Sequence, residues 1–393
     1  MVEGRRLTRL VVALPVALGA AFSYPGCGAE SEGGPMETAP DASAEAALDD
    51  AEIVEAQAPP TGCAADRGSD GLFQHLRCAG LYADFDAKRI DPAQRAYKPG
   101  LELWADGATK QRYLGLPAGT KIDTSNIDEW VFPNGTKAWK EFRLDGKRVE
   151  TRLYEKGMDG TWRHAAYRWN ADESEAERTQ NGEKIPRGGA DVPPYEIPSP
   201  NQCNDCHQGR KDKLLGLEAV SLGLAGAEGL TLATLVAEGL LSSPPSSGLL
   251  VFPEDATGKA AAALGWMHVS CGPCHNRSSA ATGEKSRIYL LTQGSKLIGV
   301  DGGAAPATVD MLDAYATTVG KTTALEIPDG GGATFLVIKA SDPSASRVSY
   351  LSGRRVAASA NPNEKEQMPP IVTRLIDISG HALLDTWISA LPP

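Results

Sequence analysis

The sequence is poor in positive charge, in long apolar runs and in histidine and methionine. Its 39 Lys and Arg residues are outnumbered by 50 Asp and Glu residues, for a net charge of −11, which argues against a chain-wide basic surface for nucleic acid. The apolar run at residues 10–22 is too short to span a bilayer. With 6 His and 6 Met residues in 393, each candidate metal ligand can be considered individually.

The N-terminal residues have the pattern of an export signal. Three arginines precede the apolar run: Arg5, Arg6 and Arg9. This order predicts a signal peptide at residues 1–26. Cys27 then resembles the lipidation site of bacterial lipoproteins, with ordinary cleavage between residues 20 and 29 as the alternative. A lipid on Cys27 would hold the mature chain, which has no predicted transmembrane helix, at a membrane surface outside the cytoplasm.

The next two segments differ sharply in composition. Residues 27–62 are acidic and lack aromatic side chains, so we expect a disordered tether. Residues 63–200 are expected to form a β-rich domain. Apolar and polar residues alternate between hairpin-type turns there, which predicts antiparallel strands at residues 129–132, 138–144, 149–154 and 162–169. Five of the seven tryptophans (104, 130, 139, 162 and 169) lie in this region, which favours a core of large side chains over a stacking surface.

Beyond residue 200 the pattern becomes helical. Amphipathic spacing predicts helices at residues 214–224, 231–241, 259–269 and 379–391. The predicted fold class is therefore α+β, with an N-terminal antiparallel β domain followed by a mostly α region. We divide the mostly α region into two segments, at residues 201–262 and 263–393.

The chemistry is predicted by a motif that occurs twice. Each copy has the spacing C-x-x-C-H: Cys203, Cys206 and His207 in the first, Cys271, Cys274 and His275 in the second. This spacing lets two thiols form thioether bonds to one haem while the adjacent histidine binds its iron. The sequence therefore predicts two covalently attached haem c groups, with His207 and His275 as proximal iron ligands. The mostly α region is then expected to be a dihaem cytochrome c region, with a first haem segment at residues 201–262 and a second, cytochrome c-like domain at residues 263–393.

Paired cysteines have two other common uses, which are zinc binding and thiol redox chemistry. The four cysteines could bind zinc, but zinc ribbons separate their pairs by about 15–20 residues, whereas 64 residues lie between Cys206 and Cys271. A thioredoxin-like redox pair would require a βαβ pattern around the motif, and neither copy has one. Haem attachment is the better prediction.

The sixth iron ligands are less closely specified. Met368 precedes two prolines shortly before the last predicted helix, where a thioether can face the second haem. No methionine and no second histidine lies near the first motif, so its sixth ligand must come from elsewhere in the chain. His268 is the first choice, His164 the second and Met267 the third, and an iron without a sixth protein ligand is the remaining alternative.

The remaining two cysteines are predicted to pair with each other. Cys63 and Cys78 lie in an exported segment ahead of the sheet, a setting in which a disulfide is expected. Such a bridge would stabilise the fold by about 3 kcal/mol.

Two parts of the sequence resemble known cytochromes. Residues 263–393 look like a class I cytochrome c domain, because a helix leads into C-x-x-C-H, Gln367-Met368-Pro369-Pro370 follows, and a helix containing Trp387 ends the chain. Residues 101–393 resemble a family of exported bacterial dihaem c-type cytochromes with a β-rich N-terminal region. The matching segments are residues 103–110, 132–136, 149–153, 197–203, 341–343 and 367–370.

The resemblance implies electron transfer and says little about a substrate. We expect a periplasmic or membrane-tethered dihaem cytochrome that transfers single electrons between redox protein partners, with no separate catalytic residues. The alternative is a haem-dependent oxidoreductase or peroxidase whose β domain binds a substrate or partner, since a missing sixth ligand at the first haem would leave an open position.

Overall fold

A computed structural model of the chain describes residues 62–189, 192–298, 306–322, 336–356 and 366–393. All of these residues belong to one compact unit, which spans residues 52–393. The predicted signal peptide, Cys27 and all but the last residue of the predicted tether lie outside the described residues. Within the described part of the chain, no helix is both long enough and apolar enough to cross a membrane.

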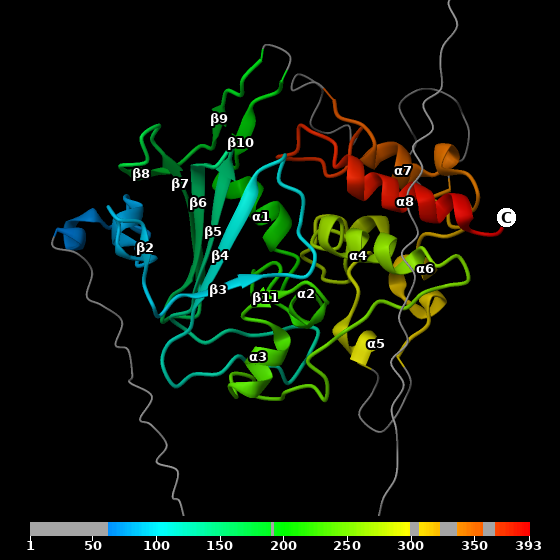
Figure 1. The fold of residues 1–393 in the computed structure, drawn as a ribbon, viewed down its shortest axis with the longest axis horizontal. Helices are drawn as coiled ribbons and strands as arrows, with labels where there is room; N and C mark the ends of the chain where they lie inside the picture. The colour runs from blue at the N-terminus through cyan, green and yellow to red at the C-terminus, as the bar shows by residue number, and fades with distance from the viewer. Residues whose placement is uncertain (1–61, 190–191, 299–305, 323–335, 357–365) are drawn as a thin grey trace, which may run out of the picture. The chain divides into compact units, whose positions relative to one another are not determined.

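The centre of the fold is an antiparallel sheet of seven strands (Figure 1). Their order is β11-β3-β4-β5-β6-β7-β8. The strands are β3 (Arg95–Lys98), β4 (Thr109–Gly115), β5 (Lys137–Leu144), β6 (Lys147–Lys156), β7 (Trp162–Trp169), β8 (Ala176–Thr179) and β11 (Glu228–Gly229). Two separate hairpins pair β1 (Tyr82–Asp84) with β2 (Arg89–Ile90) and β9 (Glu183–Ile185) with β10 (Tyr195–Ile197).

Local sequence accounts for the central strands. The alternating segments at residues 138–144, 149–154 and 162–169 form β5, β6 and β7. Asp145 and Gly146 join β5 to β6, and both have the positive φ angles, 49° and 79°, that a two-residue hairpin turn requires. The expected strand at residues 129–132 is reduced to a single bridge between Asp123 and Val131.

The two faces of the sheet have different partners. Trp139, Leu153 and Tyr167 point to one face, where they form a core with Leu72 and Leu76 of the N-terminal segment. Figure 1 shows this blue segment beside the sheet, with the helices α4 and α8 away from it on the other side. The second face carries the residues that alternate with these, and it is turned toward the two C-x-x-C-H motifs.

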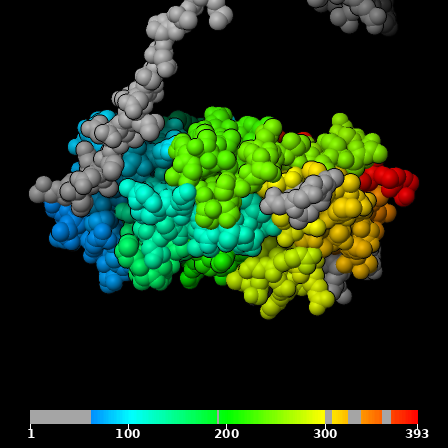
Figure 2. All heavy atoms as spheres, turned by 90° about the horizontal axis from the view of Figure 1, so that it is seen from below, coloured from blue at the N-terminus to red at the C-terminus, as the bar shows by residue number. Residues whose placement is uncertain are grey.

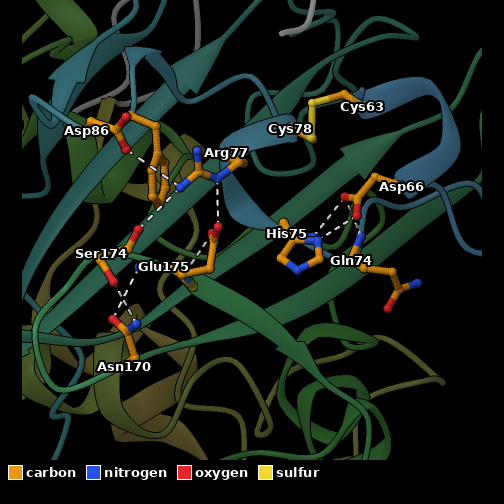
Figure 3. Close-up of polar contacts among 12 residues, drawn as sticks. Cys63, Asp66, Gln74, His75, Arg77, Cys78, Asp86, Asn170, Ser174 and Glu175 are labelled. Atoms are coloured by element: carbon orange, nitrogen blue, oxygen red, sulfur yellow. Dashed lines mark hydrogen bonds and ion pairs between the residues drawn. A yellow bond between two sulfur atoms is a disulfide. The ribbon is translucent and has the colours of Figure 1, made fainter. Parts of the chain in front are cut away.

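The N-terminal segment is held together by a disulfide between Cys63 and Cys78, whose Cα atoms are 5.4 Å apart. The same segment contains an ion pair of His75 with Asp66, and Arg77 binds Glu175 at 2.6 Å (Figure 3). These contacts fix the segment against the sheet edge, where His75 also bridges to Glu177.

The predicted fold class was wrong, because the described residues after the sheet do not form a mostly α region. The described residues form a β-rich fold in which the helices after residue 200 are few and mostly short. They are α1 (Pro200–His207), α2 (Ala219–Gly223), α3 (Leu232–Ala237), α4 (Ala260–Ser270), α5 (Gly294–Ile298), α6 (Asp313–Ala316), α7 (Arg347–Ser352) and α8 (Ile378–Ala390). The segment between α1 and α4 also supplies β11 to the sheet, so it is not purely helical.

Glycine explains why two of the expected helices are short. Gly216 has a φ of 76° inside the segment expected to be helical from residue 214, so the helix begins only at α2. Gly239 has a φ of 66° and follows the end of α3. Irregular segments therefore occupy much of the region that the amphipathic pattern assigned to helices.

The longer helices α4 and α8 are in contact with each other (Figure 1). Trp266 of α4 donates from Nε1 to Asp377, the N-cap residue of α8, at 2.8 Å. Trp387 of α8 is fully buried in the same core as Met267 and Leu264. This pair of helices positions the residues that follow α4, which are those of the second motif.

A further contact joins the loop after β4 to the segment after α3. Ile122 donates its amide to the carbonyl of Leu240 at 2.8 Å and bridges to Leu241. Figure 2 shows the corresponding cyan and green surfaces adjoining on one face of the molecule. The sheet and the segment between the two motifs are thus parts of one core.

Candidate functional site

Both C-x-x-C-H motifs line a single cavity of about 710 Å³. The second face of the sheet forms one wall, and residues of the irregular C-terminal segments form the other. The six motif residues that line it are Cys203, Cys206, His207, Cys271, Cys274 and His275. The structure therefore brings the two copies of the motif, which are separate in the sequence, to one cavity.

The first motif lies on α1. A capping box starts this helix, because Ser199 and Gln202 each bind the other's backbone amide. Residues three and four apart share a helix face, so Cys203 can present its thiol beside Cys206 and His207. The carbonyl of Lys213 is within hydrogen-bonding reach of Nδ1 of His207, which leaves Nε2 as the nitrogen that can bind a metal.

His207 is buried and is stacked on an aromatic ring. Its imidazole lies 4.2 Å from the ring centroid of Tyr154, which in turn stacks on His164. Burial lowers the pKa of His207 well below its ordinary value, and the charge of Lys140 adds to the effect. The imidazole is therefore neutral near pH 7, the state in which it binds iron.

The second motif follows α4 directly. The carbonyl of His275 accepts a hydrogen bond from the amide of Leu290 at 2.7 Å, and its Nδ1 lies 3.3 Å from Oγ of Ser286. Gly283 passes so close that a Cβ atom there would lie 2.7 Å from Nδ1 of His275. The loop at residues 283–290 thus holds the histidine in place.

Burial keeps two of the motif cysteines as neutral thiols. It raises the pKa of Cys203 to about 11 and that of Cys271 to about 12. Neither residue is in a disulfide. Reactive cysteines have lowered pKa values, so these thiols do not have the character of catalytic nucleophiles.

The two motifs touch. Sγ of Cys274 lies 3.6 Å from the carbonyl oxygen of Asp205, and Oγ1 of Thr282 donates to the same oxygen at 2.5 Å. A hydrogen bond with Cys274, together with burial, raises the pKa of Cys206 well above its ordinary value. One cysteine of each motif therefore meets its counterpart in the other.

Met368 also lines the cavity, with Pro369 and Pro370. The amide of Met368 donates to the carbonyl of Leu351 at 2.9 Å. The buried side chain of Gln367 fixes the loop from the other side by donating to the carbonyls of Pro369 and Thr373 at 3.0 and 3.1 Å. This loop can hold the thioether at the cavity, and the role of Met368 as an iron ligand stays a prediction.

The other candidate sixth ligands are not part of the cavity lining. His268 is buried, with Nδ1 accepting from the amide of Thr292 at 3.0 Å and Nε2 3.4 Å from Glu218. Nε2 of His164 lies 3.1 Å from the carbonyl of Pro200. Met267 is fully buried in the main core. Both nitrogens of His268 are thus engaged, so its predicted role as a ligand has no geometric support here.

The cavity wall also contains a set of cations that the sequence did not predict. They come from β4, β5 and β6: Lys110, Arg112, Lys140 and Arg152. The available signal was that Lys110 and Arg112 are two residues apart, so they share one face of a strand. The register that places them beside Lys140 and Arg152 cannot be read from such spacing.

The chemistry of the lining fits covalently attached haem groups. It supplies four thiols, two histidines and a methionine, and its volume is within the ~300–1,000 Å³ typical of cofactor pockets. Four lining residues also have buried polar atoms without a hydrogen-bond partner: the hydroxyls of Tyr97 and Tyr154, Nη1 of Arg112 and Oγ of Ser270. Such atoms are rare in folded proteins, and they suit a wall that contacts a polar ligand.

The arrangement expected for zinc has no counterpart in the described residues. Within them, no group of three or more His, Cys, Asp or Glu side chains is placed to hold a metal ion.

Comparison of the chain with protein-family models, with curated proteins and with solved structures found no match. The cavity and the residues that line it are therefore the observations that bear on function.

Proposed function

We propose that the protein is an exported dihaem c-type cytochrome that transfers single electrons between redox protein partners. The observation that carries this proposal is that both C-x-x-C-H motifs and Met368 line one cavity of about 710 Å³. The spacing within each motif suits attachment of one haem. A haem group bound there supplies a reversible one-electron couple at its iron.

The chain's own residues have distinct tasks in this proposal. The thiols of Cys203, Cys206, Cys271 and Cys274 would form the thioether anchors. His207 and His275 would bind the irons through Nε2, because the carbonyl of Lys213 engages Nδ1 of His207 and the hydroxyl of Ser286 faces Nδ1 of His275. Met368 would supply its thioether to the second iron, and a His/Met pair raises the reduction potential.

Burial of the site supports a role in electron transfer. Tyr154 stacks on His207, and Trp266, Leu290 and Leu351 contribute apolar side chains to the cavity wall. A lining of this kind limits the access of water and fixes the orientation of the ligands. The contact between Cys274 and Asp205 brings the two attachment sites together, which favours exchange of electrons between them.

The proposal is tested on protein exported in a host that attaches haem c. The expected result is a haem-stained band and a pyridine haemochrome spectrum that corresponds to two haems per chain. Met368→Ala should lower the potential of one haem and change its optical and EPR spectra, whereas Met311→Ala, at a 60 % exposed methionine, should change neither. A wild-type protein without covalent haem would refute the proposal.

One observation favours a second candidate, a haem-dependent oxidoreductase or peroxidase. Among the described residues that line the cavity, the histidines and methionines are His207, His275 and Met368. With two proximal histidines and one methionine, one iron would have no sixth ligand of these types from the lining and could bind peroxide. Peroxide turnover by the half-reduced protein would support this candidate. A protein that does not turn over peroxide would favour electron transfer as the function.

A further inference from the structure

Three cations lie side by side on the cavity face of the sheet. Arg112 of β4 is directly opposite Lys140 of β5, and Lys140 is directly opposite Arg152 of β6. Lys110 lies two residues before Arg112, so it shares this face. All four side chains line the cavity that contains both motifs. We call these four residues the cation row.

The protein neutralises only part of the cation row. Glu102 binds Arg112 at 2.7 Å and Glu150 binds Arg152 at 2.5 Å. Nζ of Lys140 donates to the carbonyl of Leu215 at 3.1 Å. A second carbonyl, that of Leu103, accepts from Lys110. The described partners of the two lysines are thus uncharged.

This arrangement is costly without a further anion. Like charges that face each other across neighbouring strands repel, and burial penalises a charged group that lacks a counter-ion. Burial, with the charge of Arg112, lowers the pKa of Lys110 to about 7, and burial lowers that of Lys140 well below its ordinary value. Nη1 of Arg112, whose side chain is only 4 % exposed, has no hydrogen-bond partner.

Two carboxylates line the same cavity, those of Glu196 and Asp205. Glu196 binds Arg374 at 2.9 Å, and among the described residues the ion pairs of the cation row are those of Arg112 with Glu102 and of Arg152 with Glu150. Lys110, Lys140 and Nη1 of Arg112 therefore present donors and positive charge to a ligand that brings its own carboxylates. Charge-assisted hydrogen bonds to a carboxylate are among the stronger polar contacts in proteins.

We propose that the cation row binds the propionate carboxylates of haem in this cavity, with Lys110, Arg112 and Lys140 as the donors. This inference rests on the proposed function, because the carboxylates belong to the attached haem. The row is a positioning and tuning element, distinct from the thioether anchors and the iron ligands. A cation near the carboxylates favours the reduced, more negative state of the iron.

The test compares the reduction potentials of both haems in the holoprotein. Lys140→Met removes the central charge at similar side-chain length, Lys110→Met removes its neighbour, and Lys140→Arg retains the charge. Each Met variant should lower the reduction equilibrium constant of at least one haem about tenfold, which corresponds to about 59 mV for a one-electron step. Lys140→Arg should keep both potentials close to the wild-type values. Lys147→Met, at an exposed lysine of the same sheet, is the matched control and should leave both potentials unchanged.

The outcomes separate the two proposals. Wild-type protein without covalent haem would refute the proposed function. Covalent haem with unchanged potentials in both Met variants would overturn the cation row as a propionate site and leave the proposed function intact. If a Met variant folds with a wild-type circular dichroism spectrum but retains less haem, and Lys140→Arg retains the wild-type amount, the inference is supported. A saturable shift of the wild-type potentials on titration with sulfate would mean that the row is open to a free anion, and would overturn the inference.

Discussion

Sγ of Cys274 lies 3.6 Å from the carbonyl oxygen of Asp205, so the second C-x-x-C-H motif rests directly on the first. Cys206, the next residue along α1, is within hydrogen-bonding reach of Cys274. In haem-free protein these two thiols are therefore in contact, although they lie far apart in the sequence. The contact predicts how the motifs behave when haem is withheld.

We expect haem-free protein to form a disulfide between Cys206 and Cys274 when treated with a mild oxidant. The thiolate is the attacking species, and the hydrogen bond with Cys274 together with burial raises the pKa of Cys206. The reaction should therefore be slow at pH 7 and faster as the pH rises. Peptide mapping by mass spectrometry without reduction identifies the linkage.

The control for this prediction is Cys206→Ser, which should remove the cross-link between the motifs. Disulfides confined to each motif, from Cys203 to Cys206 and from Cys271 to Cys274, would contradict the arrangement. Such a result would mean that the two motifs are apart in the haem-free chain.

Asp212 links the first motif to the sheet through a buried ion pair. Its carboxylate accepts from Nζ of Lys156 at 2.8 and 2.9 Å and from Nε1 of Trp162 at 2.8 Å. The next residue, Lys213, supplies the carbonyl that engages His207. Asp212→Asn leaves the Lys156 charge without its counter-ion, and we expect a loss of about 3 kcal/mol in the free energy of unfolding.

Urea denaturation measures that loss. If haem is attached as proposed, the spectrum of the first haem should also change, because His207 loses part of its support. The double variant Asp212→Asn with Lys156→Met removes both charges and should recover most of the stability. If the double variant is as unstable as the single one, the hydrogen bond from Trp162 rather than the ion pair stabilises this connection.

Glu218 and His268 form a buried pair behind the second motif. Burial disfavours the charged carboxylate of Glu218, but the hydrogen bond with His268 and the charge of Arg210 outweigh it, and the pKa of Glu218 falls to about 2. Because this pKa is below its ordinary value of 4.5, the stabilisation is complete above pH 4.5. It is lost as the pH falls toward 2, and it amounts to about 3 kcal/mol.

Glu218→Gln should therefore destabilise the protein at pH 7 by about 1–3 kcal/mol, and the difference from wild type should shrink below pH 4.5. Urea denaturation at several pH values provides the measurement. Glu238→Gln is the comparison, because the Glu238 pair with Arg95 is 40 % and 44 % exposed and should contribute little. If the loss in the free energy of unfolding of Glu218→Gln does not depend on pH, the ionic role of the carboxylate is contradicted.

Sequence patterns predicted the parts of the fold that depend on residues close together in the chain. Period-two alternation and Asp-Gly turns predicted β5, β6 and β7, and the motif spacing predicted the residues that meet at the cavity. Helical periodicity was misleading after residue 200, because Gly216 and Gly239 adopt positive φ angles that end or exclude helix. A periodic apolar stripe does not reveal where the backbone turns.

The relationships that depend on register and tertiary contact could not be predicted. Lys140 faces Arg112 and Arg152 only because of the strand register, and β11 joins the sheet from a segment far along the chain. His268 was the first choice as a ligand because it lies close to Cys271 in sequence. Helix geometry instead turns it toward Glu218 and Thr292. Adjacency in sequence is a poor guide to which side of a helix meets a cavity.

The last prediction concerns the N-terminal segment that the Cys63–Cys78 disulfide closes (Figure 3). Nδ1 of His75 lies 2.5 Å from Oδ1 of Asp66, and this hydrogen bond raises the pKa of His75 above its ordinary value of 6.5. A raised pKa means that the pair stabilises the folded state fully below pH 6.5. The contribution is lost as the pH rises through the folded-state value. Since His75 is 40 % exposed, solvent screening limits its contribution to about 0.5 kcal/mol.

His75→Asn should therefore lower the stability slightly at pH 5.5 and have no effect at pH 9, where the wild-type imidazole is neutral. Thermal unfolding of both proteins at the two pH values measures the difference, and an NMR titration of the His75 ring reports its pKa directly. Asp66→Asn should return that pKa toward 6.5, because the carboxylate supplies the largest stabilisation of the imidazolium. A pKa that stays raised in Asp66→Asn would assign the effect to Glu175 and Glu177, whose charges also act on His75.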